Sequence, residues 1–517
     1  MGQLSGSVQT IKKRSHFKVT SLFVSFTIWV FRTIERKYMD NDIINILNLY
    51  DTDCEASLDK DENGTKYITV RKAKKIKYCP YCGSRLYSHG LFKRHPKHQI
   101  YQCDTKLNIT VEGRNWDCSN SNCDYTERDL FEFIEPYKQN TKIQELSILH
   151  EMKDLHKTCV QIANQYGVSD TYVHDLFSRY VDLPRLKLTP IISIDEVYLN
   201  IDNAHKYALI IMDFTTGNII DILSSRRETV TSSYFSSIPK EERDIVKYVI
   251  CDMYQPYAQY TLRYFHNAVP VTDSFHVIQW CNNYINTYIN QVRRHYLERD
   301  RKLLETKNKS SNRLIAKQTD SDEVYILKKA KWVLLMADDN IHYSAERHYN
   351  KFFDQYLDTY DWINKFMDLD VNFREIKVLK DKYIDFNREH INNRAGAEAD
   401  LEKLIQEYLS SPIKIFNEFA KILKRWKVPI LNSFTYISTT NENGEKLLRR
   451  LSNGPTESYN NNPSSYRTNS RGLSDFLFTR NRLLWSARFD AAILGNPKTY
   501  KDIKVSTNNS RGSYNKK

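Results

Sequence analysis

The chain has 517 residues, about 41% of them apolar, which is enough for hydrophobic cores in roughly three or more domains. A net charge of +13 and a pI of about 9.0 favour a polyanionic partner, with nucleic acid as the default candidate. Nine unevenly spaced cysteines exclude a disulfide scaffold of this length and indicate a reducing, cytoplasmic compartment.

The first 38 residues carry an apolar run, Leu22 to Phe31, behind a basic stretch. The run is too short and too interrupted by Ser and Thr to span a bilayer, and no small-residue cleavage site follows it. Met39 opens a conventional polar start. We therefore expect translation to begin at Met39 and residues 1–38 to be an upstream extension outside the fold, with no membrane association; an export signal is the alternative.

Residues 39–135 contain short strand patterns and two cysteine pairs. The motif CPYCGS gives Cys79 and Cys82, and WDCSNSNCDY gives Cys118 and Cys123. Four thiolates in paired loops are typical of a tetrahedral structural Zn²⁺ site, so we predict a zinc ribbon with a basic edge. Two alternatives stay open. Cys118 and Cys123 could be ordinary thiols, or a residue between the pairs could replace a ligand: Cys103, His89, His95 or His98.

Residues 140–184 have the pattern of a helix-turn-helix DNA-binding domain. Thr158 can cap a first helix, Gly167 stands at the turn, and Ser169 can cap a second helix. The apolar residues of that second helix would face inward. Its Asp170, Thr171, His174 and Arg179 would face outward, so we predict that Thr171, His174 and Arg179 contact DNA. The alternative is a helical hairpin used only for packing.

Residues 190–296 predict a five-stranded sheet in the order βββαβαβ. The strand IISIDEVYLN carries Asp195, a Thr-Thr-Gly turn joins the next two strands, and VICD ends at Asp252. A fifth strand, AVPVTD, ends at Asp273. This is the strand layout of ribonuclease H-like nucleases, in which strands one and four lie side by side. Asp195 and Asp252 should then meet across the ladder.

The remaining chain divides into three parts. Residues 297–440 show only helical periodicity and predict an all-helical insertion that interrupts the core. Residues 441–497 return to the core through a polar loop that leads to Glu457, which we expect on the helix after the insertion. Residues 498–517 predict a basic disordered tail. Most of the excess positive charge lies after residue 445, where 14 Lys and Arg accompany 4 Asp and Glu. This concentration favours one basic surface over a diffuse excess.

Three carboxylates of the predicted core, those of Asp195, Asp252 and Glu457, can form one cluster. Hard divalent cations prefer oxygen ligands, so the cluster predicts a site for two Mg²⁺ or Mn²⁺ ions. Such a pair can activate an attacking water or hydroxyl and stabilise a leaving 3′ oxygen. Each carboxylate alone is more simply a solvated group at the end of a strand or helix; the joint pattern favours the catalytic interpretation.

From Met39 to about Pro497 the sequence resembles the DDE transposases of bacterial insertion sequences, in particular the ISL-three family. The matching stretches are CPYCGS, SIDEVY, VICDMYQPY, NAVPVTDSFHV and LSNGPTESYNN. The resemblance implies that Asp195, Asp252 and Glu457 are the catalytic triad. It also implies that Asp273 and His276 belong to an element that supports the site without being its first metal ligands.

The sequence departs from the family after the triad glutamate. Ser458 replaces a usual Gly, and PSSYRTNSRG replaces a Lys-rich stretch. Arg467 and Arg471 are therefore the basic residues left there to contact DNA, and we predict that they do.

The resemblance implies a multidomain α+β transposase that binds the terminal inverted repeats of its element and catalyses metal-dependent strand cleavage and strand transfer. Its partners would be double-stranded DNA at the transposon ends and the target, and further copies of itself in a synaptic complex associated with the nucleoid. Two alternatives remain: a non-catalytic DNA-binding protein derived from a transposase, and a ribonuclease H-like nuclease. The intact triad disfavours the first, and the second does not predict the two N-terminal DNA-binding modules.

Overall fold

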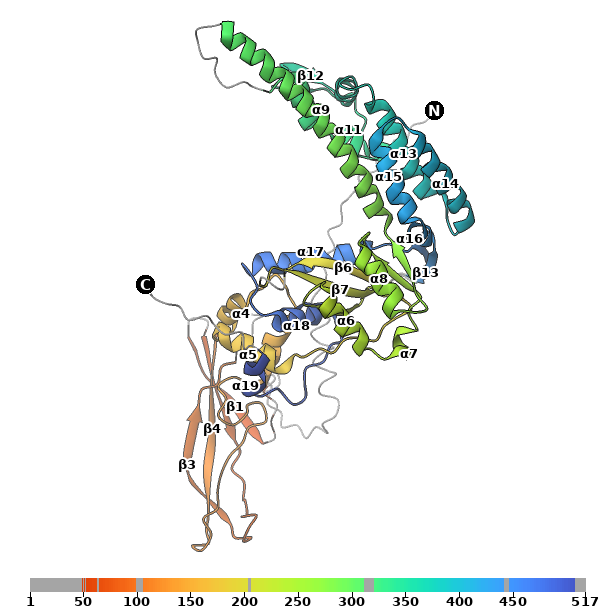
Figure 1. The fold of residues 1–517 in the computed structure, drawn as a ribbon. Helices are drawn as coiled ribbons and strands as arrows, with labels where there is room; N and C mark the ends of the chain where they lie inside the picture. The colour runs from red at the N-terminus through yellow and green to blue at the C-terminus, as the bar shows by residue number, and fades with distance from the viewer. Residues whose placement is uncertain are drawn as a thin grey trace, which may run out of the picture. The chain divides into compact units, whose positions relative to one another are not determined.

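The computed structural model describes residues 49, 51, 53–62, 65–98, 106–202, 206–310, 320–440 and 446–506 (Figure 1). The predicted upstream extension at residues 1–38 lies outside these ranges, as does its apolar run. Within them, no helix is both long and apolar enough to cross a bilayer. The described residues fall into two compact units, one within residues 49–148 together with 165–167, and one within residues 149–164 and 168–506.

The N-terminal unit is built on a mixed five-stranded sheet. Its strands are β1 (Cys54–Glu62), β2 (Thr65–Lys72), β3 (Leu86–Arg94), β4 (Lys106–Cys118) and β5 (Thr126–Arg128). The order is β1-β2-β4-β3, with β5 also paired to β4; only the β2–β4 pair is parallel. Alternating apolar residues such as Ile68 and Val70 face a core that includes Phe131 and Phe133. This unit is therefore larger than a minimal ribbon, and the cysteine loops sit at one end of its sheet.

Three short helices follow: α3 (Lys142–Glu151), α4 (Cys159–Tyr166) and α5 (Asp170–Tyr180). The predicted capping is present, because the Tyr172 backbone N–H donates to the Ser169 hydroxyl at 3.1 Å. Gly167, between α4 and α5, has a φ of +62°, a left-handed conformation that favours glycine. The two helices and the glycine turn predicted from the sequence are confirmed.

The second unit is centred on a five-stranded sheet of β6 (Ile191–Tyr198), β7 (Tyr207–Asp213), β8 (Ile219–Leu223), β9 (Tyr248–Cys251) and β10 (Val269–Thr272). Helices α6 (Glu228–Ser237), α7 (Lys240–Arg243) and α8 (Gln255–Tyr264) connect its later strands. The order is β10-β9-β6-β7-β8. Strands β10, β9 and β6 are parallel to one another, and β7 is antiparallel to both of its neighbours, β6 and β8. The predicted strand sequence and the pairing of the first strand with the fourth are confirmed.

The two faces of this sheet are covered by different parts of the chain. Ile192 and Ile194 of β6 pack with Phe235 of α6 and with Tyr257 and Tyr264 of α8. Successive residues of a strand point to opposite faces, so Ser193 and Asp195 face the other side. There the Ser193 hydroxyl contacts the Thr456 hydroxyl of α17 (Gly454–Asn469). This face holds the candidate site.

Most of the chain between β10 and α17 forms a helical lobe (Figure 1). Its elements are α9 (Ser274–Ser310), α10 (Asp322–Lys329), α11 (Trp332–Leu335), η2 (Asp338–Asn340), β11 (His348–Asn350), β12 (Gln355–Leu357), α12 (Thr359–Met367), α13 (Phe373–Glu389), α14 (Arg394–Ser410), α15 (Lys414–Arg425) and α16 (Lys427–Asn432). Two predictions about this lobe need correction. It is not all-helical, because β11 and β12 pair as a small hairpin of their own.

The predicted start of the insertion at residue 297 is also wrong, because it falls inside α9. Val277, Cys281, Ile285 and Ile289 recur every fourth residue along α9 and are buried in the core of the lobe. The lobe therefore begins directly after β10. Its core includes Phe366, Tyr383 and Phe416 from three other helices, which explains the helical periodicity of the sequence.

The return to the sheet runs through a hairpin of β13 (Tyr436–Thr440) and β14 (Lys446–Arg450), then α17, α18 (Phe476–Ala487) and α19 (Tyr500–Ser506). The hairpin was not predicted. The predicted disordered tail is wrong for the residues of α19, because this segment packs on α5. The Lys498 backbone N–H donates to the Arg179 carbonyl at 2.9 Å, and Tyr500 lies against the Arg179 guanidinium. Residues 507–517 lie outside the described residues.

Candidate active site

Two aspartates meet where β6 and β9 lie side by side. The parallel register pairs Ile194 with Cys251, so Asp195 and Asp252 are the next residues along neighbouring strands. β6 continues beyond this point, whereas β9 ends at Cys251 and leaves Asp252 in the following loop. Asp195 is only 7% exposed. The sheet therefore brings together two carboxylates that are far apart in the sequence, as predicted.

Glu457 reaches the same place from the first turn of α17. Its backbone N–H donates to the Asn453 carbonyl at 3.0 Å, which closes that turn. One residue earlier, buried Thr456 anchors the helix on the sheet through Ser193. The neighbouring Glu457 is thereby held toward the strand ends.

His276 stands between Asp252 and Glu457. It lies in the first turn of α9, and its Nε2 is 2.6 Å from Asp252 Oδ1 and 3.1 Å from Glu457 Oε1. The ring N–H has hydrogen-bond alignment with neither oxygen, so both contacts are ion pairs. Burial acts to lower the pKa of His276, but Asp252, followed by Asp273 and Glu457, outweighs it and raises the pKa to about 9. The imidazolium thus supplies a positive charge among the carboxylates at neutral pH.

Asp195 lies close to other negatively charged groups. Burial, followed by the charge of Asp252, raises the pKa of Asp195 to about 7. The backbone N–H of Glu196 donates to Asp195 Oδ1 at 2.7 Å, and the Asn460 amide donates to Oδ2 at 2.6 Å. Burial and the charge of Asp273 also raise the pKa of Glu457. Such shifts are typical of a site built to receive a cation.

Asp273 and two asparagines complete the surroundings. Asp273 is 4% exposed and accepts the backbone N–H groups of Phe275, at 2.8 Å, and of Asn453. The Asn453 side chain lies with its Nδ2 3.4 Å from Asp252 Oδ1. Asp273 therefore positions α9 and the start of α17, as the resemblance implies. Sequence reasoning assigned no role to Asn453 or Asn460, although their spacing around Glu457 could have indicated one.

The donors of this site fit a hard divalent cation. Two buried side-chain oxygens here, Asn453 Oδ1 and Asn460 Oδ1, have no hydrogen-bond partner, whereas His276 Nε2 and Glu457 Oε1 are engaged in the ion pairs described above. Buried polar groups are normally paired, so these two oxygens indicate a missing partner. The three carboxylates do not all lie within 4.8 Å of one another, which is expected for like charges with His276 among them.

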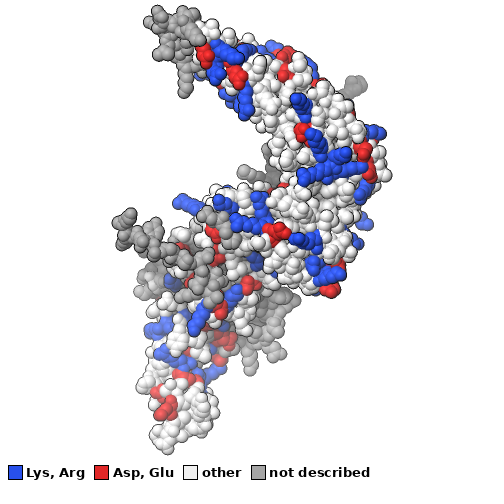
Figure 2. All heavy atoms as spheres, viewed as in Figure 1, with Lys and Arg blue, Asp and Glu red and all other residues white. Residues whose placement is uncertain are grey.

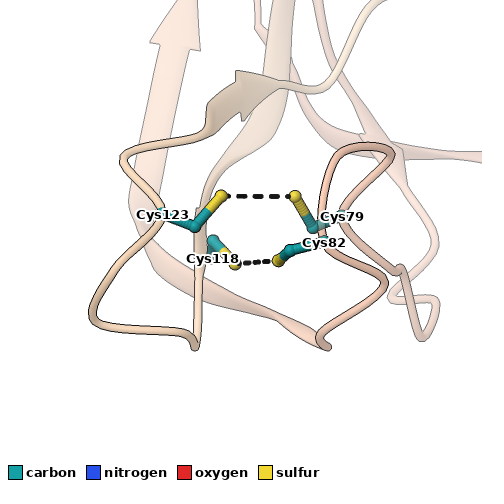
Figure 3. A group of neighbouring side chains, drawn as sticks. All are labelled: Cys79, Cys82, Cys118 and Cys123. Atoms are coloured by element: carbon teal, nitrogen blue, oxygen red, sulfur yellow. Dashed lines mark hydrogen bonds between the residues drawn. The ribbon is translucent and has the colours of Figure 1, made fainter.

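The four cysteines form a tighter cluster. Cys79 and Cys82 lie on the loop before β3, and Cys118 and Cys123 lie at the end of β4 and just after it (Figure 3). Their sulfurs are all within 4.8 Å of one another, with 3.7 Å between Cys79 and Cys123 and 3.4 Å between Cys82 and Cys118. Tetrahedral Zn²⁺ with bonds of about 2.3 Å separates its sulfurs by about 3.8 Å. The cluster fits this ion.

The alternative zinc ligands are engaged elsewhere. His89 faces Asp117 at 3.4 Å, His95 contacts Thr110 at 3.2 Å, and buried His98 contacts Thr141 at 2.8 Å. Cys103 lies outside the described residues. Hydrogen bonds from Ser84 lower the pKa of the Cys82 thiol to about 6, whereas the pKa of Cys118 is raised to about 12 and that of Cys123 is also raised, with burial and the neighbouring thiols among the causes. Four thiols this close cannot all ionise without a cation to balance them.

The predicted DNA contacts divide into two groups. Thr171 and Arg471 are exposed, and Arg467 is half-buried with its guanidinium 4.9 Å from the centre of the Tyr198 ring. His174 and Arg179 are only partly exposed, because other segments lie against them. His174 stacks on Phe478 at 4.2 Å, and the Arg179 Nε donates to the Lys498 carbonyl at 3.0 Å. The sequence of α5 alone could not show that α18 and the C-terminal segment cover this side.

Charge is not gathered in one region of the face drawn in Figure 2, where Lys and Arg side chains are interspersed with Asp and Glu. The single basic surface expected from the C-terminal composition is not visible on this face. Arg480 and Arg482 illustrate why. Arg480 pairs with Asp221 at 2.5 Å, and Arg482 is fully buried.

The model of the ISL-three family of DDE proteins, described as a transposase, matches residues 192–483, more than half of the chain. The matched range includes Asp195, Asp252, His276 and Glu457. No curated protein matches the sequence.

Proposed function

Because the chain belongs to the ISL-three family of DDE transposases, we propose that Asp195, Asp252 and Glu457 form the active site with which it cleaves and joins DNA. Membership of this family implies an enzyme that binds and cleaves DNA. The finer proposal is a ribonuclease H-like core that cuts at the terminal inverted repeats of an insertion sequence and transfers the freed ends to target DNA.

One observation carries this proposal: three carboxylates from distant parts of the sequence converge beside the paired inner strands β6 and β9. Asp195 and Asp252 follow paired residues of parallel strands, and Glu457 lies with Asp252 around His276. Asp195 is buried, and the side chains of Asp252 and Glu457 are 31% and 34% exposed. Gathering several carboxylates around one partly buried point is unfavourable unless a cation or a reaction needs them. A sheet that served only as a DNA-binding scaffold would have no such need.

Asp195, Asp252 and Glu457 would hold Mg²⁺ or Mn²⁺. When bound, these ions would supply activation of the attacking oxygen and stabilisation of the leaving 3′ oxygen. The chain itself performs three tasks. α17 and the strand ends fix the three carboxylates, Asp273 holds the two helix starts in place, and the protonated His276 keeps a positive charge near the reacting phosphate.

The chemistry proceeds in two balanced steps. In the first, the oxygen of water attacks the scissile phosphorus, the bond from phosphorus to the 3′ oxygen breaks, and that oxygen leaves as a 3′-OH after gaining a proton. In the second, this 3′-OH attacks a phosphodiester of the target, and one ester bond forms as another breaks. Neither step needs an oxidant, a reductant or a high-energy cofactor.

Contacts to DNA would come from other parts of the chain. A Zn²⁺-bound Cys79, Cys82, Cys118 and Cys123 cluster would stabilise the loops of the N-terminal unit, and α4 and α5 have the helix-turn-helix pattern. Thr171, Arg467 and Arg471 remain candidates for DNA contact, together with the partly covered His174 and Arg179. We expect the protein to act as a homo-oligomer that joins both ends of its element, in the cytoplasm at the nucleoid.

The full-length protein should cut labelled DNA that carries the ends of its own element. We expect Mg²⁺-dependent nicking at the 3′ end of each inverted repeat and, with added target DNA, covalent joined products visible on a denaturing gel. DNA of the same composition but shuffled sequence is the control. Specific binding without cleavage in Mg²⁺ or Mn²⁺ would favour the non-catalytic alternative, and cleavage of RNA–DNA hybrids in preference to these ends would favour a nuclease.

The site should also respond to pH in a metal-dependent way. Asp195 has a pKa of about 7 and must be ionised to hold a cation. As the pH falls through about 7, a proton competes with Mg²⁺, so apparent Mg²⁺ affinity should decrease, by up to about tenfold per pH unit. Cleavage rates measured from pH 5.5 to 8.5 at several Mg²⁺ concentrations should show a midpoint that moves lower as Mg²⁺ increases. A midpoint independent of Mg²⁺ would contradict this role for Asp195.

A further inference from the structure

We propose that Asn453 and Asn460 are ligands of the divalent cation held by the three carboxylates, through their side-chain carbonyl oxygens. The inference rests on the proposed function, since it concerns the same site. It adds two neutral ligands to the carboxylate triad.

The spacing of these residues places them together. Asn453, Glu457 and Asn460 are separated by four and three positions, so they lie on one face of the start of α17. Asn453 is the residue that precedes the helix, and its carbonyl accepts the Glu457 N–H at 3.0 Å. This face is turned toward β6, because the Asn460 amide reaches both Asp195 Oδ2 and, at 3.3 Å, the Glu196 carbonyl. One helix face therefore presents a carboxylate flanked by two amides to the strand ends.

Asn453 is completely buried between Asp252 and Asp273. Its backbone is fixed by Asp273, whereas its side chain makes only a long contact, 3.4 Å from Nδ2 to Asp252 Oδ1. Its side-chain carbonyl oxygen, Oδ1, is buried and accepts no hydrogen bond. A role limited to donating a hydrogen bond to Asp252 does not explain why this oxygen is kept away from water.

Asn460 shows the same arrangement beside the other aspartate. Its Nδ2 donates to Asp195 Oδ2 at 2.6 Å, and its Oδ1 is also buried without a partner. A half-turn about the bond between Cβ and Cγ exchanges nitrogen and oxygen in either side chain. Each amide oxygen would then lie beside an aspartate oxygen, at a separation close to the roughly 3 Å between adjacent oxygen ligands of one Mg²⁺ ion.

The test measures how many ligands a bound ion has, and it does not depend on catalytic activity. Full-length protein without DNA is titrated with Eu³⁺, an oxygen-seeking probe, and luminescence lifetimes in H₂O and D₂O give the number of waters on the ion. Signal that disappears in Asp252→Asn belongs to this site. We expect Asn453→Ala and Asn460→Ala each to add about one bound water and to weaken Eu³⁺ binding by about tenfold or more. Asn461→Ala, an exposed neighbour, is the matched control and should change neither value.

Asn453→Asp keeps folding effects separate from ligand loss, because it preserves size and one oxygen while removing the amide donor. It should keep the wild-type water count, whereas a residue that only donates a hydrogen bond would behave no better as Asp than as Ala. Unchanged water counts in both alanine variants, with binding still lost in Asp252→Asn, would overturn this inference and leave the proposed function standing. Eu³⁺ binding that survives Asp252→Asn unchanged would instead overturn the cation site itself.

Discussion

Replacing Asp252 by asparagine should abolish DNA strand cleavage while leaving DNA-end binding within about twofold of wild type. Asn has the shape of Asp but lacks the charge that a hard cation requires. A metal ion contributes several kcal/mol to phosphoryl-transfer catalysis, and each 1.36 kcal/mol is a factor of ten in rate. We therefore expect a loss of at least about 10³-fold in single-turnover cleavage. End binding should persist, because contacts to the DNA backbone and grooves come from other parts of the chain.

The control for this variant is Glu228→Gln, which also removes one carboxylate from the same unit. Glu228 is exposed on α6 and pairs only with the exposed Arg263 at 2.7 Å. Such a surface pair contributes little to stability, so cleavage should stay near wild type. Thermal unfolding of both variants would show that they are folded. Normal cleavage by folded Asp252→Asn protein would remove Asp252 from the catalytic site.

Loss of zinc should have the largest effect on the structure of the N-terminal unit. We expect one Zn²⁺ per chain at Cys79, Cys82, Cys118 and Cys123, and a Cys79→Ser variant that no longer retains it. Metal binding and folding are coupled in such sites, with apparent zinc-binding free energies of about 10–16 kcal/mol in small zinc domains. The loops that carry the cysteines should therefore become sensitive to proteases. Elemental analysis and limited proteolysis of freshly purified protein measure both effects.

Cys159→Ser is the comparison for the zinc experiment. Cys159 begins α4 in the other unit, and its nearest polar contact is Arg482 at 3.9 Å rather than another thiol. Zinc content and protease resistance should be unchanged in this variant. Full zinc occupancy in Cys79→Ser, or freshly purified wild-type protein without zinc, would contradict the assignment of the four cysteines.

The elements of the central sheet could be predicted because their apolar runs are short, continuous and bounded by turn residues. Strands buried on both faces have this pattern whatever surrounds them. The order of strands and helices along the chain predicted that β6 pairs with β9. This pairing in turn predicted that Asp195 and Asp252 meet. Ser169 could be assigned as a helix cap because capping depends on residues within one turn.

The start of the helical lobe could not be found in this way. α9 runs without a break from the candidate site into the lobe. Its polar residues do not mark the point where the helix leaves the site and begins to pack in the core of the lobe. The β11–β12 hairpin, with only three residues in each strand, is too short to produce a detectable alternation. Both depend on contacts with residues distant in the sequence.

The partial covering of the outward side of α5 could not be predicted, for the same reason. His174 and Arg179 are polar, and a polar helix face usually points to water. Phe478 and Tyr500, about three hundred residues later in the chain, lie against these side chains and leave them only partly exposed. Local periodicity describes one helix and contains no information about which segment packs against it.

The sequence by itself determined the kinds of chemistry available to this protein: four thiolates in two close pairs, and carboxylates within or just after buried strands. Residue type and local spacing decide such features, because metal preference and strand formation depend on them directly. Only the tertiary structure decided that Glu457 meets Asp252 around His276, and that Asn453 and Asn460 flank the carboxylates with buried, unpaired oxygens. These contacts join segments separated by roughly 180 to 265 positions, so they exist only after the sheet, α9 and α17 have packed together.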